Sequence, residues 1–287
     1  MRFRRIGDIE VSAIGLGGMP MSIEGRPGRE RSIATIHAAL DAGVTLIDTA
    51  DAYTTDADGP GHNEKLIAEA LRGRPEKVLV ATKGGMIHRD GGPWDRRGDP
   101  AYLKKAARES LARLEVKAIG LYQFHRPDPT VPYEDSIGAL LELLDEGVIL
   151  MVGISNANIE QIRLADRVLG GRLASVQNQF SPAYRSSLDE LEYCVEHEIA
   201  FLPWSPLGGI GRQRFEGSAF EEVAAEQTAS TERPVSPQQV ALAWELSLGH
   251  CVIPIPGSTR PESITDSARA ADLELTEDQL ERLSEPS

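Results

Sequence analysis

Four side chains with acid–base chemistry each follow a short apolar run in this sequence: Asp48, Tyr53, Lys83 and His125. A buried carboxylate needs a cationic or hydrogen-bonding partner, and a lysine beside it stays charged. A cation near a phenol favours the phenolate, so we expect the pKa of Tyr53 to be lowered toward a range useful for proton donation. His125 would orient a substrate oxygen or assist proton transfer. Such a set protonates an oxygen but supplies no electrons, and it therefore implies a redox cofactor.

The elements that must position these residues form a repeating pattern of strands and helices. Short apolar runs recur at residues 46–47, 78–81, 119–122, 150–154, 174–176, 200–202 and 251–253. Apolar residues with helical spacing lie between them, in stripes at residues 33–40, 103–111, 137–144 and 159–169. Ser236-Pro237 predicts the beginning of a further helix, with Ser236 as its N-cap. Residues 3–11 alternate around Gly7-Asp8 as a hairpin, and residues 11–17 follow as the first candidate strand.

About eight strand–helix units without a break in composition predict an α/β fold of the (β/α)8 TIM-barrel type, with residues 1–287 as a single domain. The rival is an open doubly wound sheet, which favours a glycine-rich G-x-G-x-x-G turn after its first strand. Residues 15–20 lack the third glycine and run into Pro20. In a barrel, function collects at the carboxyl ends of the strands, where all four residues fall. Each alone could be a cap, a surface ring or a solvated charge, but their conjunction on one rim rarely arises by accident.

Composition excludes several classes of function. The net charge of −14 argues against a general nucleic-acid surface.

Residues 137–154 form the richest apolar stretch but contain three acids, and the N-terminus lacks the apolar region of a signal peptide. We therefore expect a cytoplasmic protein without a membrane span. Cys194 and Cys251 match no metal or redox spacing, and the histidines show none either, so we expect no metal site.

The sequence resembles the aldo-keto reductase family from residue 3 to about residue 283. The motifs that carry the resemblance, specific in their order and spacing, are DTADAY at 48–53, GHNE at 61–64, TK at 82–83, HRPD at 125–128, GISN at 153–156 and IPGS at 255–258. The resemblance implies a TIM barrel with an N-terminal β-hairpin closing its bottom. It also implies that Asp48, Tyr53, Lys83 and His125 are the catalytic residues, with Tyr53 as the general acid. Asn63 and Glu64 are expected to be structural.

The same resemblance implies that NADPH delivers a hydride to a carbonyl carbon. Ser155, Asn156 and Gln177 would hold the nicotinamide amide, Trp204 would stack on its ring, and residues 205–208 would cradle the pyrophosphate. The implied cofactor-binding residues are Gly18, Met19, Ser155, Asn156, Gln177, Trp204, Ser205, Pro206, Leu207, Gly208, Gly257, Ser258, Thr259, Arg260, Ser263, Asp266 and Ser267.

The chain departs from the family pattern at the expected 2′-phosphate site. Many members carry lysine at the position of Gly257 and arginine at that of Ser263, whereas Arg260 is the cation available here, before a helix that would begin near Pro261. The pair expected to meet the adenine is Asp266 and Ser267. NADPH is therefore favoured, with NADH as the alternative.

The substrate is expected to be a small carbonyl compound of unspecified class. The loops at residues 19–27 and 84–100 should wall its pocket, where Trp94 would pack against it or only pin its own loop. Two other functions stay open: a Schiff-base aldolase using Lys83, and a nucleotide-sensing interaction module with little turnover. The family default for the assembly is a monomer.

Overall fold

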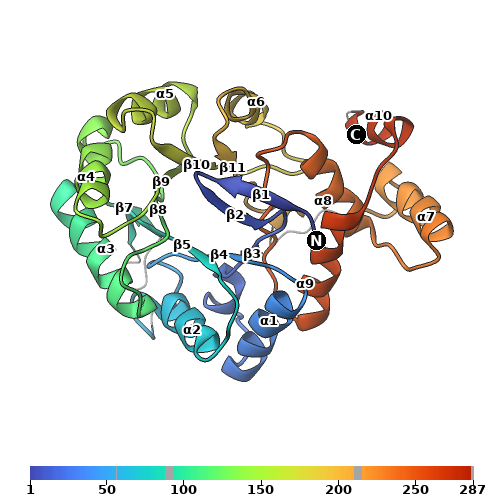
Figure 1. Ribbon diagram of the computed structural model, residues 1–287, viewed down its shortest axis with the longest axis horizontal. Coiled ribbons are helices and arrows are strands. Elements are labelled where there is room, and N and C mark those ends of the chain that lie inside the picture. The colour runs from blue at the N-terminus through green and yellow to red at the C-terminus, as the bar shows by residue number, and fades with distance from the viewer. Residues whose placement is uncertain (56, 88–93, 210–214, 286–287) are drawn as a thin grey trace.

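A computed structural model describes residues 1–55, 57–87, 94–209 and 215–285 of the chain (Figure 1). In this part of the chain a parallel sheet runs in the order β11-β10-β9-β8-β5-β4-β3. Its strands are β3 (Leu16–Gly17), β4 (Leu46–Asp48), β5 (Leu79–Gly84), β8 (Leu121–Phe124), β9 (Val152–Ser155), β10 (Leu173–Gln177) and β11 (Ala200–Phe201). The predicted apolar runs from residue 46 to residue 202 are confirmed as these strands.

Residues 252–257 occupy the eighth position and close the ring between β11 and β3. Val252 pairs with Phe201 on one side and Gly257 with Gly17 on the other, both in parallel. The N–H of Ile253 donates to Phe201 O at 2.8 Å, and the N–H of Gly17 donates to Pro256 O at 3.0 Å. Prolines cannot donate to a ladder, which explains why this segment forms isolated bridges instead of a regular strand. The predicted (β/α)8 barrel is confirmed, and an open sheet is excluded.

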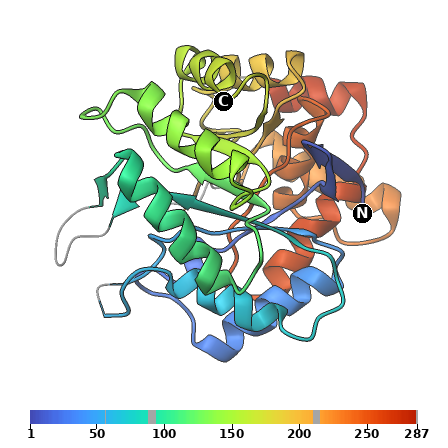
Figure 2. The ribbon, with the colours of Figure 1, turned by 60° about the vertical axis from the view of Figure 1, so that its left-hand side comes forward.

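The helices pack on the outside of the sheet, as Figures 1 and 2 show. The stripes predicted from spacing are confirmed in α1 (Arg29–Asp41), α3 (Pro100–Leu114), α4 (Tyr133–Asp145) and α5 (Ile159–Val168), although the last predicted residue, Leu169, is the C-cap of α5. The other helices are α2 (His62–Leu71), α6 (Leu188–Glu196), α7 (Ala219–Thr231), α8 (Pro237–Ser247), α9 (Pro261–Ala268) and α10 (Glu277–Ser284), with short 3-10 turns η1 (Met19–Met21) and η3 (Arg269–Asp272).

The start of α8 follows the predicted pattern. Ser236 is the N-cap, and its side chain accepts a hydrogen bond from Gln239 N at 3.1 Å. The Gln239 side chain turns away and donates to Asp266 Oδ1 at 2.6 Å, so the N-terminus of α8 is joined to α9.

The N-terminal hairpin lies across one end of the barrel (Figure 1). It consists of β1 (Phe3–Ile6) and β2 (Ile9–Ser12), joined at Gly7 with φ +53. Ile6 and Val11 pack on the inward-facing apolar residues of the strands, among them Leu46, Leu79 and Leu121. The predicted hairpin is confirmed.

The predicted boundary of the first barrel strand is wrong. Ser12 still belongs to β2, and its backbone N–H and hydroxyl both bond Thr45, at 2.8 and 2.9 Å. The chain must leave the hairpin before it enters the barrel, so only Leu16–Gly17 forms β3. In the described part of the chain no helix combines the length and apolar content needed to cross a membrane.

Candidate active site

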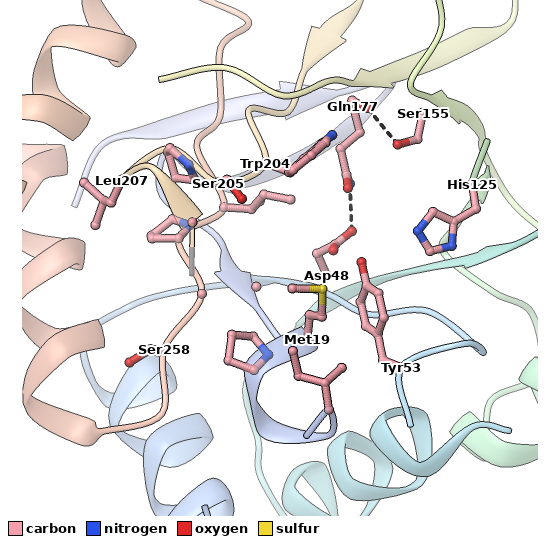
Figure 3. Close-up of a pocket in the computed structure, with 18 of the residues that line it drawn as sticks. Met19, Asp48, Tyr53, His125, Ser155, Gln177, Trp204, Ser205, Leu207 and Ser258 are labelled. Carbon is pink, nitrogen blue, oxygen red and sulfur yellow. Dashed lines mark hydrogen bonds between the residues drawn. The ribbon is translucent and has the colours of Figure 1, made fainter. Parts of the chain in front are cut away.

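A cavity of about 600 Å³ opens at the carboxyl ends of the barrel strands (Figure 3). Its wall includes residues at or after the ends of β3, β4, β5, β8, β9, β10 and β11 and from the segment 255–259. The alternation of side chains along each strand explains which residues point inward. Leu46 contributes to the inner barrel core, so Asp48 two residues later faces the same interior; Ala81 and Lys83 follow the same rule.

Asp48, Lys83 and Tyr53 form a continuous hydrogen-bonded group beneath this cavity. Lys83 Nζ lies 2.6 Å from Asp48 Oδ2, 2.9 Å from Thr49 O and 3.0 Å from Tyr53 Oη. Lys83 is completely buried and Asp48 nearly so. Burial lowers the pKa of Lys83, but Asp48 and Tyr53 raise it, and the net shift is upward. The ammonium is therefore kept charged, as the sequence predicted.

The prediction for the pKa of Tyr53 is wrong in sign. Burial raises this pKa above the ordinary value of 10.0, and the opposing effect of Lys83 does not outweigh it. The sequence shows the cation but not how completely the phenol is enclosed. In this structure Tyr53 is thus held protonated, with the ammonium placed to stabilise the phenolate once a proton leaves.

His125 stands beside Tyr53, with ring centroids 5.8 Å apart in an edge-to-face arrangement (Figure 3). Burial, Lys83 and Arg126 all hold the pKa of His125 well below its ordinary value of 6.5, so the imidazole is neutral. Its Nδ1 is buried and has no hydrogen-bond partner among the described residues. An unpartnered lone pair is less costly than an unpartnered N–H, which favours the tautomer that carries its proton on Nε2.

A layer of buried amides supports the carboxylate. Asp48 Oδ1 accepts hydrogen bonds from Gln177 Nε2 at 2.8 Å and from Gln123 Nε2 at 3.4 Å, and Ser175 Oγ donates to Gln123 Oε1 at 3.2 Å. Gln177 was predicted for the site, but Gln123 was not. The signal that could have found Gln123 is the inward alternation that it shares with Leu121 and His125.

Asn156 joins the ends of two strands. Its Nδ2 donates to His125 O and to Ser155 Oγ, both at 3.0 Å, and its Oδ1 accepts from Arg126 Nη2 at 3.0 Å. Ser155 Oγ in turn donates to Gln177 O at 2.7 Å. Asn156 has φ +57, a left-handed conformation that is uncommon for residues other than glycine and is often held at functional sites.

Comparison with known proteins agrees with this geometry. The sequence profile of the Aldo/keto reductase family matches residues 13–286. The chain belongs to the aldo/keto reductase family. It is 33% identical to an uncharacterised oxidoreductase of Schizosaccharomyces pombe, with 98% of this chain and 88% of that protein covered. It is 34% identical to 6-dehydroglucose reductase of Novosphingobium aromaticivorans, with 93% and 90% covered.

Solved structures of the family superpose on the whole barrel. The glycerol dehydrogenase of Gluconobacter oxydans matches with a TM-score of 0.83 and 28% identity, over 98% of this chain and 93% of that one. An aldo/keto reductase of Klebsiella pneumoniae in complex with NADP and acetate matches with a TM-score of 0.81 and 27% identity, over the same shares.

In this aldo/keto reductase most of the predicted cofactor residues line the one cavity described above. They are Met19, Ser155, Asn156, Gln177, Trp204, Ser205, Pro206, Leu207, Gly257, Ser258 and Thr259. Trp204 Nε1 is buried without a hydrogen-bond partner in the described part of the chain, and Ser205 has φ +55. Gly18 and Gly208 do not line the cavity. A side chain at Gly18 would meet Asn63 Oδ1 at 2.4 Å, so this glycine serves packing behind the wall.

Four predicted cofactor residues of the reductase lie away from the cavity wall: Arg260, Ser263, Asp266 and Ser267. Arg260 is exposed and is the N-cap of α9. Asp266 already accepts from Ser236 Oγ and Gln239 Nε2, each at 2.6 Å, which joins α8 to α9. Contacts of these four residues with an adenine nucleotide stay predictions.

The two loops that were predicted to wall a substrate pocket both contribute residues to the cavity. Met19, Ile23 and Glu24 come from the loop after β3, and Met86 and Trp94 from the loop after β5. The short strands β6 (Met86–Ile87) and β7 (Asp95–Arg96) pair and hold this second loop. Trp94 lies 6.3 Å from Tyr53 between ring centroids. Residues 88–93 of the loop are outside the described part of the chain.

Asn63 and Glu64 are structural, as expected. Asn63 Oδ1 accepts from Thr49 Oγ1 at 2.6 Å, and its Nδ2 donates to Gly18 O at 2.9 Å, so it ties together the loops after β3 and β4. Glu64 bonds Thr82, the neighbour of Lys83, at 2.6 Å. Arg126 also lines the cavity, and the prediction missed it although it directly follows His125 in the HRPD motif.

Proposed function

We propose that this protein reduces an aldehyde or ketone to an alcohol with NADPH as the reductant. The observation that carries the proposal is the position of Tyr53 Oη, 3.0 Å from a buried ammonium and on the wall of a cavity shared with His125 and Trp204. A phenol placed in this way can give a proton to a carbonyl oxygen, because the adjacent Lys83 stabilises the negative charge left on the phenol.

Each member of the group has a distinct part in the proton transfer. Tyr53 acts as general acid, and Asp48 keeps Lys83 charged and fixed. Neutral His125 donates a hydrogen bond from Nε2 to the carbonyl oxygen and orients it. Together these groups stabilise the charge that develops on oxygen as the carbonyl carbon is reduced.

The cavity fits a nicotinamide cofactor. Amide and hydroxyl groups of Ser155, Asn156 and Gln177 would hold the carboxamide, and the face of Trp204 would stack on the ring. When bound, NADPH supplies the hydride for the carbonyl carbon. The choice of NADPH over NADH is supported by family structures that contain NADP and NADPH, and by Arg260 at the N-terminus of α9.

A Schiff-base aldolase is disfavoured by the surroundings of Lys83. A nucleophilic amine must be unprotonated, whereas the pKa of Lys83 is raised and its Nζ lies within hydrogen-bond distance of three oxygens. The remaining alternative, a nucleotide sensor, shares the same cavity and is distinguished by turnover.

The test is the Tyr53→Phe variant, with Tyr184→Phe as the matched control because Tyr184 is 44% exposed. Tyr53→Phe should lower kcat/KM for 4-nitrobenzaldehyde by about 100-fold or more, since general acid catalysis contributes that much. The Kd for NADPH, measured by tryptophan fluorescence, should stay within about threefold because the phenol is not among the proposed cofactor contacts.

Reduction by Tyr53→Phe at the parent rate would show that the proton donor is another group. Cofactor binding by the parent without reduction of any aldehyde would favour the sensor instead.

A further inference from the structure

Arg126 is a charged residue on the cavity wall that the proposed proton transfer does not use. It directly follows His125 at the end of β8, and it lines the same cavity as Tyr53 and Trp94. Its side chain is partly buried. It therefore lines the cavity together with Met86 and Trp94, which belong to the described part of the loop after β5.

No carboxylate among the described residues neutralises the charge of Arg126. Within the described ranges no carboxylate lies within ion-pair distance of its guanidinium, whereas arginines such as Arg26, Arg113 and Arg282 each pair with an acid. Burial and the nearby Arg96 both lower the pKa of Arg126, and no acid of the described residues raises it. In a chain with a net charge of −14, a partly buried cation without an acid is unusual and favours an anion in the cavity.

Most of the hydrogen-bonding capacity of Arg126 is also unused. A guanidinium has five N–H donors, and in the described part of the chain one of its nitrogens, Nη2, donates to Asn156 Oδ1 at 3.0 Å. The remaining donors form the planar fork that matches the two oxygens of a carboxylate or phosphate.

The two acids on the cavity wall, Asp48 and Glu24, do not oppose the binding of an anion by Arg126. Asp48 is neutralised by Lys83 at 2.6 Å. Glu24 also lines the cavity, but it is exposed, so solvent screens its charge. Met19, Met86 and Trp94 offer apolar surface for the remainder of a substrate.

We propose that Arg126 binds an anionic group, a carboxylate or a phosphate, carried by the carbonyl substrate. This inference rests on the proposed reductase function and names the substrate class of that same site. The enzyme should therefore prefer aldehydes with a negative charge over neutral aldehydes of the same shape.

The experiment compares matched pairs of substrates at fixed salt. One pair is 4-carboxybenzaldehyde and its neutral methyl ester, and the other is glyceraldehyde 3-phosphate and glyceraldehyde. For each pair the measured quantity is the ratio of kcat/KM for the charged member to that for the neutral one. An Arg126 variant also loses the hydrogen bond to Asn156, which is expected to lower activity toward both substrates of a pair equally. The ratio is unaffected by such an equal loss.

The wild type should favour the charged member of at least one pair by about tenfold or more, and the pair concerned distinguishes carboxylate from phosphate. Arg126→Met should lower that ratio by roughly 10- to 100-fold, and Arg126→Gln should do the same because its amide is neutral, although it keeps a hydrogen-bond donor at this residue. The control is Arg97→Met, which removes an equal charge from a residue that pairs with Asp99 at 2.9 Å, outside the cavity wall. Its ratio should change by less than about twofold, because the side chain of Arg97 is 52% exposed and solvent screens its charge.

Three results would overturn the inference while leaving the reductase intact. The first is a wild-type ratio near one in both pairs. The second is an unchanged ratio in both Arg126 variants with unchanged activity. The third is an equal loss of kcat/KM for both members together with weaker NADPH binding, which would make Arg126 a positioning residue for Asn156. Absence of reduction of all four aldehydes by the wild type would instead contradict the proposed function.

Discussion

Lys83 shows how a fully buried charge is tolerated in this protein. Its ammonium is matched by the carboxylate of Asp48, a backbone carbonyl and the phenol of Tyr53, so its three N–H donors all have acceptors. Removing one partner of such a pair leaves the other charge buried alone, which is far more costly than removing both.

Lys83→Met should therefore affect stability and activity by separable routes. We expect it to lower the free energy of unfolding by about 3–5 kcal/mol, because Asp48 is left without its cation. Catalysis should fall by roughly 100-fold or more, since the charge that stabilises the phenolate is gone. Urea denaturation and aldehyde reduction measure the two effects.

The double variant Asp48→Asn with Lys83→Met provides the matched comparison. It removes both charges and should recover much of the lost stability while catalysis stays low. Equal instability of the single and double variants would contradict the view that an unpaired Asp48 is the cause.

Much of the candidate site could be predicted at the level of residues. Asp48, Lys83 and His125 follow apolar runs, and the inward alternation brings them to one interior. The direction of the Tyr53 pKa could not be predicted, because it depends on how completely distant segments enclose the phenol. Arg126 was missed because a sequence does not show which residues are neighbours in space. What distinguishes Arg126 is that no carboxylate of the described residues lies close to it.

At the level of elements, a buried ion pair connects α2 and α3 behind the strand that carries Lys83. Arg113 Nε lies 2.6 Å from Glu64 Oε2, and Glu64 is completely buried. Gly61 at the start of α2 makes room for this contact: a Cβ at this residue would lie 2.1 Å from Arg113 Cδ. Because Glu64 also bonds Thr82, the pair supports the backbone next to Lys83.

Arg113→Met should destabilise the protein by about 3–5 kcal/mol, because Glu64 remains buried without its cation. Arg108→Met is the control on the same helix. Arg108 pairs with Glu146 between α3 and α4, where both side chains are nearly half exposed, and its loss should cost about 1 kcal/mol or less. Urea midpoints that fall equally in the two variants would contradict a special role for Glu64.

Elements with strong periodicity could be predicted well, and elements without it could not. The stripes at residues 103–111 and 137–144 lie within α3 and α4, and Ser236 caps α8 as expected. The first and eighth strands were harder to place. β3 has only two residues, and the eighth segment contains two prolines, so neither has the length or the donors by which a strand is recognised.

At the scale of the whole molecule, the two ends of the barrel have different tasks. The hairpin β1–β2 covers one end with an apolar plug, and the cavity opens at the other end. Substitutions in the plug should therefore change the stability of the fold without changing the geometry of the site.

Ile6→Ala tests this division. Ile6 is fully buried in the inner core, so the variant should lose about 2–5 kcal/mol of stability, while kcat/KM for an aldehyde at low temperature should stay within about twofold. Phe3→Ala in the same hairpin should cost about 0.5 kcal/mol or less, because Phe3 is 52% exposed. A large loss of kcat/KM in folded Ile6→Ala would show that the two ends are coupled.

The prolines of the eighth segment have a mechanical consequence for the ring. Pro254 and Pro256 accept hydrogen bonds from the N–H groups of Gly15 and Gly17 but return none, so this edge has fewer crosslinks than the regular ladder between β5 and β8. We therefore expect larger backbone movements where residues 257–259 border the cavity. The opposite wall, which holds Lys83 and His125, should be more rigid. Accordingly, we expect a bound ligand to displace the proline-containing edge slightly, while the distance between Lys83 and His125 stays unchanged.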